Sequence, residues 1–351
     1  MNLGLRVLVA VVLLGVTCPG WAAFERSIAL CQSPSPSQRQ TLEALARKVD
    51  QTFSPAQCAV LYHHLSTKKK INFFRKDGVS DLSPLGELTS LQSLYVSGVH
   101  FSVDLSHLSG LSELVELTFA SHTLKVSAWE SIGNFHKLKV LIVEHSQIDN
   151  LAPLANLKEL EKLEMNRSRI SNLAPLIALT RLRSLSLASN LITDLRPLSK
   201  LTNLEDLMLL GNKISDIRPL QNMTKLKTLY LTNNKVSDLT PLAGLMALEQ
   251  LFLDNNAIED VSPLQGLVNM KKLVLSSNHL RDVTPLRNLQ KLRELMLSYN
   301  QITDTSVLTG MKDMRIFNVI LNPLRDCMPQ AAHEIRAGMK CPDEKTPVGK
   351  K

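Results

Sequence analysis

One segment recurs every 22 residues through the second half of the chain. In each copy the third residue is Asp and the sixth and seventh are Pro-Leu; the copies begin at Ile192, Ile214, Val236, Ile258 and Leu280. Asn follows the same period at Asn190, Asn212, Asn234, Asn256, Asn278, Asn300 and Asn322. A unit of this length cannot bury its apolar face alone, so successive copies must stack on one another.

Within one unit, the apolar positions predict a short strand followed by a turn. Residues 204–214 read L-x-x-L-x-L-x-x-N-x-I, with the leucines directed inward. Asn212 is expected to turn inward as well, because its amide both donates and accepts hydrogen bonds and can satisfy backbone groups at the bend. Asp216 then precedes a short helical turn that contains Pro219, where we expect it to act as a cap.

This pattern resembles the leucine-rich repeats of bacterial internalins, whose 22-residue units carry the same D-x-x-P-L turn, over about residues 79–322. The resemblance implies an α/β solenoid: a leucine-rich repeat horseshoe with a parallel concave sheet and 3-10 or short helical turns on the convex side. About eleven strands are expected, with second leucine positions at Leu94, Leu117, Leu141, Leu163, Leu185, Leu207, Leu229, Leu251, Leu273, Leu295 and Phe317. The early coils have longer steps, with Ser146 and Ser168 in place of Asn, and should vary locally.

Residues 1–23 are predicted to be an export signal. Arg6 precedes an apolar run over residues 7–16, and small residues follow around Ala22. This run is about half of the roughly 20 residues that cross a bilayer, so no membrane span is expected. Cys18 raises the alternative of a lipid anchor, which we disfavour because the residues before it do not fit a lipoprotein signal. The protein is therefore expected to be secreted or periplasmic.

Atypical caps are expected at both ends of such a stack, because each end would otherwise expose the core. Residues 24–78 predict an N-terminal cap with helices near residues 38–49 and 55–65. Residues 323–351 predict a C-terminal cap and tail, with a helix over residues 328–339.

Four cysteines remain after removal of the signal: Cys31, Cys58, Cys327 and Cys341. Strands about 4.8 Å apart would separate the two ends by roughly 48 Å over ten steps. A disulfide needs Cα atoms within about 7 Å, so the predicted pairs are Cys31–Cys58 and Cys327–Cys341. A metal site would need ligands from both ends and is disfavoured.

The net charge of +8 comes from outside the repeats, because residues 79–322 carry 24 basic and 24 acidic side chains. A neutral repeat region lacks the basic stripe on which nucleic-acid binding depends, so no nucleic-acid partner is expected. The dense basic cluster at residues 68–70 with Arg75 and Lys76 is interpreted as a solvated turn after a helix. The alternative is that this cluster binds a glycan or an anionic envelope polymer.

Sequence motifs typical of hydrolytic enzymes are incomplete or absent. His333-Glu334 would need a second His at position 337, which is Ala, to form a zinc-hydrolase motif. No G-x-S-x-G sequence is present. We therefore expect a protein that is not an enzyme and has no cofactor and no bound metal.

Side chains alternate along a strand, so residues between the leucines should face outward on the concave sheet. The middle outward positions of five successive coils are all apolar: Met208, Tyr230, Phe252, Val274 and Met296. Leu210 and Tyr299 should extend this surface. Contiguous exposed apolar surface is typical of interfaces, and internalins hold a host receptor on this face with prominent aromatic side chains. The predicted function is an exported module that binds a protein partner here; the alternative is that these side chains only stabilise the sheet.

Overall fold

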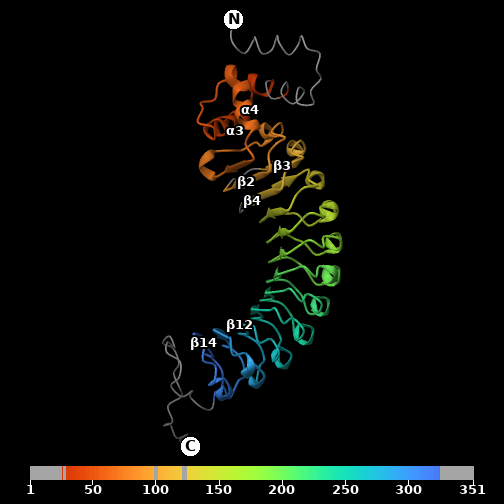
Figure 1. Cartoon of the computed structure of the whole chain (residues 1–351), viewed down its shortest axis with the longest axis vertical. Helices are drawn as coiled ribbons and strands as arrows, with labels where there is room; N and C mark the ends of the chain where they lie inside the picture. Colours follow the sequence, from red (N-terminus) through yellow and green to blue (C-terminus); the bar gives the residue numbers. More distant parts are fainter. Residues whose placement is uncertain (1–25, 27–28, 99–101, 121–124, 325–351) are drawn as a thin grey trace, which may run out of the picture. The chain divides into compact units, whose positions relative to one another are not determined.

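The computed structural model describes residues 26, 29–98, 102–120 and 125–324. They form two compact units, which divide between Arg169 and Ile170. In each unit a short parallel strand alternates with a 3-10 turn, coil after coil (Figure 1). Within the second unit the strands line the inner side of the curve and the turns lie on the outer side. This arrangement confirms the predicted parallel sheet with 3-10 turns opposite to it.

Two helices form the N-terminal cap, close to the predicted positions. Helix α3 spans Pro36–Arg47 and starts with a capping box between Ser35 and Gln38. Helix α4 spans Cys58–Ser66 and follows the 3-10 turn η1 (Pro55–Gln57). Leu42, Leu45 and Leu65 from these helices are fully buried in the core of the cap.

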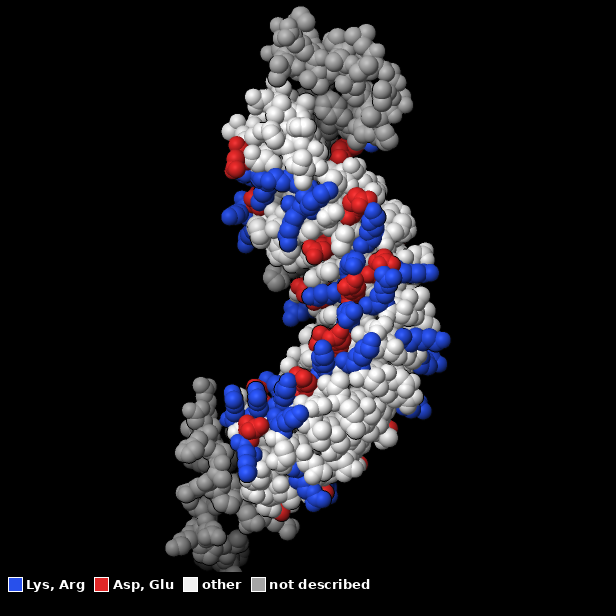
Figure 2. All heavy atoms as spheres, in the orientation of Figure 1, with Lys and Arg blue, Asp and Glu red and all other residues white. Residues whose placement is uncertain are grey.

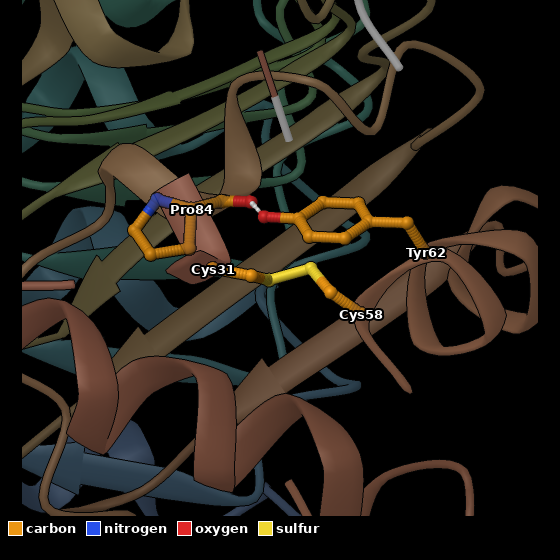
Figure 3. Close-up of a disulfide and its surroundings, with 4 residues drawn as sticks. All are labelled: Cys31, Cys58, Tyr62 and Pro84. Carbon is orange, nitrogen blue, oxygen red and sulfur yellow. Dashed lines mark hydrogen bonds between the residues drawn. A yellow bond between two sulfur atoms is a disulfide. The ribbon is translucent and has the colours of Figure 1, made fainter. Parts of the chain in front are cut away.

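A disulfide joins Cys31 to Cys58, at the start of α4, with a Cα–Cα distance of 6.0 Å (Figure 3). This confirms the first predicted pair. Beside it, the Tyr62 hydroxyl donates a hydrogen bond to the carbonyl oxygen of Pro84, 2.8 Å away. Burial raises the pKa of Tyr62, and the charge of Glu87 adds to the effect, so the hydroxyl stays protonated as a donor. The hydrogen bond fastens α4 to the 3-10 turn that contains Pro84.

The turn predicted for the basic cluster is interrupted by a strand, which begins at Lys70. Strand β1 (Lys70–Phe73) buries Ile71 and Phe73 and pairs in parallel with β2 (Ser93–Ser97). Ile71 lies opposite Leu94 and takes the place of a repeat leucine. The cap therefore contributes a strand to the sheet of the first unit in addition to the predicted ones.

The first unit continues the sheet through β4 (Glu116–Ala120), β6 (Val140–Val143) and β7 (Lys162–Glu164), all parallel. Its turns are η2 (Arg75–Asp77), η3 (Ser83–Leu85), η4 (Leu105–Leu108), η5 (Trp129–Asn134) and η6 (Ala152–Asn156). A small parallel sheet of β3 (Ser102–Asp104) and β5 (Lys125–Ser127) was not predicted. It occupies the coils with the longer steps, so the extra residues there form additional strand pairing.

The second unit repeats one register without change. Its strands are β8 (Ser184–Ser186), β9 (Asp206–Met208), β10 (Thr228–Tyr230), β11 (Gln250–Phe252), β12 (Lys272–Val274), β13 (Glu294–Met296) and β14 (Ile316–Asn318). Each pairs with the residues 22 positions further on, so that Leu207, Leu229 and Leu251 stack. These leucines are fully buried. Strands thus lie at all eleven positions predicted across the two units.

The turns of the second unit are η7 (Ala174–Leu176), η8 (Arg196–Lys200), η9 (Arg218–Leu220), η10 (Thr240–Leu242), η11 (Ser262–Leu264), η12 (Thr284–Asn288) and η13 (Ser306–Leu308). The predicted role of the repeat Asp holds for η8 to η13, where it lies one residue before the N-cap and accepts a hydrogen bond from the first backbone N–H of the turn; Asn172 does the same at η7. Asp216 Oδ1 accepts a hydrogen bond from the backbone N–H of Arg218 at 2.9 Å, and Pro219 follows inside the turn. Equivalent carboxylates serve the neighbouring turns.

The repeat asparagines form the predicted ladder. Asn212 Nδ2 donates to the carbonyl oxygens of Leu187 and Leu209 at 3.0 and 2.9 Å, and its Oδ1 accepts from the N–H of Ile192 at 3.0 Å. In the first unit, Ser146 and Ser168 occupy the ladder position, with their hydroxyl oxygens 3.1 Å apart. The amide ladder is thus replaced by hydroxyls where the coils are irregular.

The predicted export signal, Cys18, Cys327, Cys341 and the helix at residues 328–339 lie outside the described residues. None of the helices within the described part is long and apolar enough to cross a membrane.

Candidate protein-binding surface

The five apolar residues predicted to face a partner form one continuous row in the second unit. Each is the last residue of its strand, from β9 to β13, and each lies directly opposite the next in the parallel register. The members of this apolar row are Met208, Tyr230, Phe252, Val274 and Met296. All five are half-buried, while the leucines beside them in each strand are fully buried. The row therefore lies on the face of the sheet opposite to the leucine core.

Two aromatic rings are stacked at the middle of the apolar row. The rings of Tyr230 and Phe252 have centroids 4.1 Å apart and planes 9° apart. Strands are spaced by about 4.8 Å, so rings stacked at this distance stand upright on the sheet, side by side. The two rings therefore cover each other's facing sides.

A lysine extends the aromatic pair on its far side. Lys272 Nζ lies over the Phe252 ring, 5.4 Å from its centroid, and pairs with Glu294 at 2.5 Å. Tyr230 is on β10 and Lys272 on β12, so they approach Phe252 from the strands on either side of β11. Sequence reasoning missed Lys272. The same alternation that gave the apolar row could have found it, as the outward residue two positions before Val274.

Polar side chains border the apolar row on both sides. One border is Asp206, Thr228, Gln250, Lys272 and Glu294; the other is Thr232, Asp254, Ser276 and Ser298. Thr232 donates a hydrogen bond to Asp254 at 2.7 Å, and the Ser298 hydroxyl donates to Ser276 at 2.9 Å. Among the described residues, Asp206 and Asp254 make no ion pair. The surface thus has an apolar centre, polar edges and two carboxylates available to a cationic group.

The two residues expected to extend the row occupy different positions. Leu210 is half-buried and lies two residues beyond Met208, on the border otherwise formed by Thr232 and Asp254. Tyr299 is 61% exposed and has a left-handed backbone, with φ of 57°. It belongs to the bend that leaves β13, so it lies at the margin of the surface rather than in the row.

Charges along the edge of the second unit alternate in sign. Glu205 lies between Lys227 and Arg183, at 2.7 and 3.0 Å, and hydrogen bonds from both hold its pKa below the ordinary value. Lys271 pairs with Glu249 at 2.7 Å in the same way. Figure 2 shows positive and negative side chains interspersed on the face in view. Within the described part of the chain, no group of three His, Cys, Asp or Glu side chains could hold a metal ion.

Comparisons with known proteins agree with the repeat pattern. The family model for leucine-rich repeats in two copies matches residues 180–222, 208–244 and 247–288. No curated protein matches the chain in sequence. Among solved structures, the chain is similar to the internalin InlF from Listeria monocytogenes, with 27% identity, a TM-score of 0.70, and 86% of this chain and 93% of the other covered.

Two further structures share the fold at lower identity. A leucine-rich repeat protein of Leptospira interrogans has 22% identity and a TM-score of 0.60, with 69% of each chain covered. The plant peptide hormone receptor RGFR1, solved in complex with RGF2, has 19% identity and a TM-score of 0.62, with 73% of this chain and 44% of the receptor covered.

Proposed function

Because the chain is a leucine-rich repeat protein of the internalin type, we propose that it is an exported, non-enzymatic binding module. It recognises a protein partner through the apolar row from Met208 to Met296, with Leu210 and Tyr299 at the margins. The observation that carries this proposal is the continuity of the row over five strands in one register.

The composition of the surface supports a protein ligand. Protein interfaces combine an apolar centre rich in Tyr, Phe and Met with a polar rim, and this surface has both. The side chains of the row are half-buried and already held by their neighbours, so they would lose little additional entropy when a partner binds. The complex of the plant peptide hormone receptor with RGF2 is a precedent for ligand binding on this fold.

Export is supported by the oxidised cap. The Cys31–Cys58 disulfide persists only where thiols are not kept reduced, which favours a secreted or periplasmic protein. The predicted signal over residues 1–23 agrees with this, and we continue to disfavour a lipid anchor at Cys18.

The test uses two baits that differ only in the aromatic pair. Oxidised wild-type protein and the Tyr230→Ala/Phe252→Ala variant are presented to the same candidate lysates, and the proteins retained by the wild type alone are identified by mass spectrometry. Calorimetric titration with that partner should then show a loss of about 2 kcal/mol for each single variant, the range of interface hot spots.

Arg218→Ala and Arg287→Ala provide the matched controls, because both arginines lie on the outer turns and are exposed. Neither should change the affinity. The proposal fails if both baits retain the same proteins. It also fails if the aromatic variants lower the melting temperature while affinity per folded molecule stays intact, as sheet stabilisation alone would predict.

A further inference from the structure

The charged side chains beside the apolar row are mostly acidic. The outward positions on the two borders of the row carry three carboxylates and one lysine. That lysine, Lys272, pairs with Glu294, which leaves Asp206 and Asp254 without an ion pair within the described residues. Lys227 is close enough for its charge to interact with that of Asp206, but it already pairs with another carboxylate at 2.7 Å. The borders therefore have a net negative charge.

The two unpaired carboxylates lie on opposite sides of the row. Asp206 precedes Met208 by two residues on β9. Asp254 follows Phe252 by two residues, and Leu253 between them is fully buried, so the Asp254 side chain shares the outward face. Four residues of strand separate the two borders, which is about 13 Å at roughly 3.3 Å per residue. A partner that covers the row therefore meets one free negative charge on each side of it.

The dimensions of this surface match those of an α-helix laid along the row. A helix with its side chains is about 10–12 Å wide, so it reaches from one border to the other. Five strands spaced by about 4.8 Å extend over about 19 Å, the length of a helix of about 13 residues. The strands of the second unit line the inner side of its curve, which suits a rounded partner (Figure 1).

The placement of the charges favours a helix over an extended segment. A helix with apolar residues at every third or fourth position presents one apolar stripe and carries polar side chains on both flanks. An extended segment directs its side chains alternately toward the sheet and away from it, so none points to either border. Charges on both sides of an apolar row are therefore complementary to the two flanks of an amphipathic helix.

We propose that the partner contributes a cationic amphipathic α-helix. Its apolar stripe packs along the row from Met208 to Met296, and Lys or Arg side chains on its two flanks pair with Asp206 and Asp254. Insertion of an amphipathic helix onto an apolar surface is a recurrent mode of protein recognition. This inference rests on the proposed function, because it specifies the chemistry of the partner at the same surface.

The experiment measures the affinity of three labelled synthetic peptides for the oxidised full chain by fluorescence anisotropy. Each has about 13 residues, the length of the row. The first has leucines at helical spacing and lysines elsewhere; the second has glutamates in place of the lysines; the third has the composition of the first with leucine and lysine alternating. The first should bind at least about tenfold more tightly than the others, because like charges repel in the second and alternation favours a strand in the third.

Variants of the two carboxylates test the charge pairing. Asp206→Asn and Asp254→Asn should each weaken binding of the first peptide about threefold, since both sites are partly exposed. The amide of Asp254→Asn keeps an oxygen that can accept the hydrogen bond from Thr232. The charge-reversed double variant Asp206→Lys/Asp254→Lys should instead prefer the glutamate peptide. Glu259→Gln is the matched control, because Glu259 is exposed outside the row, and it should change neither affinity.

The inference is overturned if the first peptide does not bind, if the alternating peptide binds as tightly, or if the charge variants leave the preference unchanged. Phe252→Ala should weaken the first peptide about tenfold or more, as expected of a central contact. If the peptides fail but a partner retained from lysate still depends on Tyr230 and Phe252, the helix is wrong and the proposed function stands. If that dependence is absent as well, both are wrong.

Discussion

The ring of Tyr230 lies almost parallel to that of Phe252, 4.1 Å away, and the two residues are direct register partners on neighbouring strands. A stacked aromatic pair contributes about 0.5–1.5 kcal/mol beyond the area that it buries. The pair therefore stabilises the sheet and also forms part of the candidate binding surface. Its contribution to folding and its contribution to binding have to be measured separately.

A double-mutant cycle gives the first prediction. Tyr230→Ala and Phe252→Ala, alone and together, should show a coupling of about 1 kcal/mol in the free energy of unfolding, because each single variant already destroys the stack. Urea denaturation measures it. Met208→Ala and Met296→Ala are the matched pair, since they lie four strands apart in the same row and should be additive. Equal coupling in both pairs would contradict a specific stack.

The asparagine ladder gives the second prediction. Asn256 accepts a hydrogen bond from the N–H of Val236 at 2.9 Å and donates to the carbonyl oxygens of Leu231 and Leu253 at 2.9 and 3.0 Å. Asn256→Ala leaves these groups unpaired and should lower the free energy of unfolding by about 1–3 kcal/mol. Thermal and urea melts measure the loss.

The control for the ladder must be an exposed Asn whose backbone conformation tolerates replacement by Ala. Asn255 faces the surface, but its φ of 54° is left-handed, so replacement by Ala would cost backbone energy of its own. Asn288, exposed at the end of η12, is the suitable control, and Asn288→Ala should be nearly neutral. A loss as large as that of Asn256→Ala would refute a special role for the ladder.

Acid stability gives the third prediction. The pKa of Asp216 is lowered from 3.8 to about 2 by hydrogen bonds from the Arg218 side chain and backbone; pKa values are also lowered for Asp194, Asp238, Asp282 and Asp304. A folded pKa below the unfolded value contributes stability above the unfolded pKa, which is lost as the pH falls through the folded pKa. The melting temperature should therefore fall between about pH 4 and about pH 2.

A triple variant identifies the carboxylates responsible. Asp194→Asn, Asp216→Asn and Asp238→Asn keep an oxygen that can accept the backbone hydrogen bond of each turn but no longer titrate. The melting temperature of this variant should depend less steeply on pH than that of the wild type. An unchanged slope would assign the acid loss to other groups.

The cap disulfide gives the fourth prediction. Cys31→Ser with Cys58→Ser opens a loop with a sequence separation of 27 and should lower stability by about 3 kcal/mol in the chain-entropy model. Hydrogen exchange should rise in α3 and α4 and stay unchanged in β10 to β12. Non-reducing peptide mapping should also recover the predicted Cys327–Cys341 pair; a link from Cys31 to Cys341 would contradict both caps.

Where the leucine period is regular, the sequence was sufficient to place every strand, because each inward position is set by stacking on its equivalents 22 residues away. Strand β1 escaped prediction because Ile71 and Phe73 replace the leucines and three lysines precede them, a composition typical of a solvated turn. The small sheet of β3 and β5 arises from the irregular coils, where no period exists to be read.

The candidate surface was predictable in part for the same reason. Alternation along the strand is enough to place Tyr230 and Phe252 side by side. Alternation does not determine the rotamers of the two side chains, which depend on how they pack against each other. The ring stack and the position of Lys272 over Phe252 could therefore be seen only in the structure. Tyr299 lies outside the row because it occupies the left-handed bend position that recurs every 22 residues, as at Asn255 and Ser277.

The hydrogen bonds of the ladder have a direction. Asn212, Asn234, Asn256, Asn278 and Asn300 each donate to a carbonyl 25 residues earlier and accept from an N–H 20 residues earlier. Each of these coils thus completes the coil before it, and truncation from the carboxyl end within this region removes the side-chain partner of the last remaining coil. During synthesis, which proceeds from the amino end, each arriving coil supplies the asparagine that finishes the one before it.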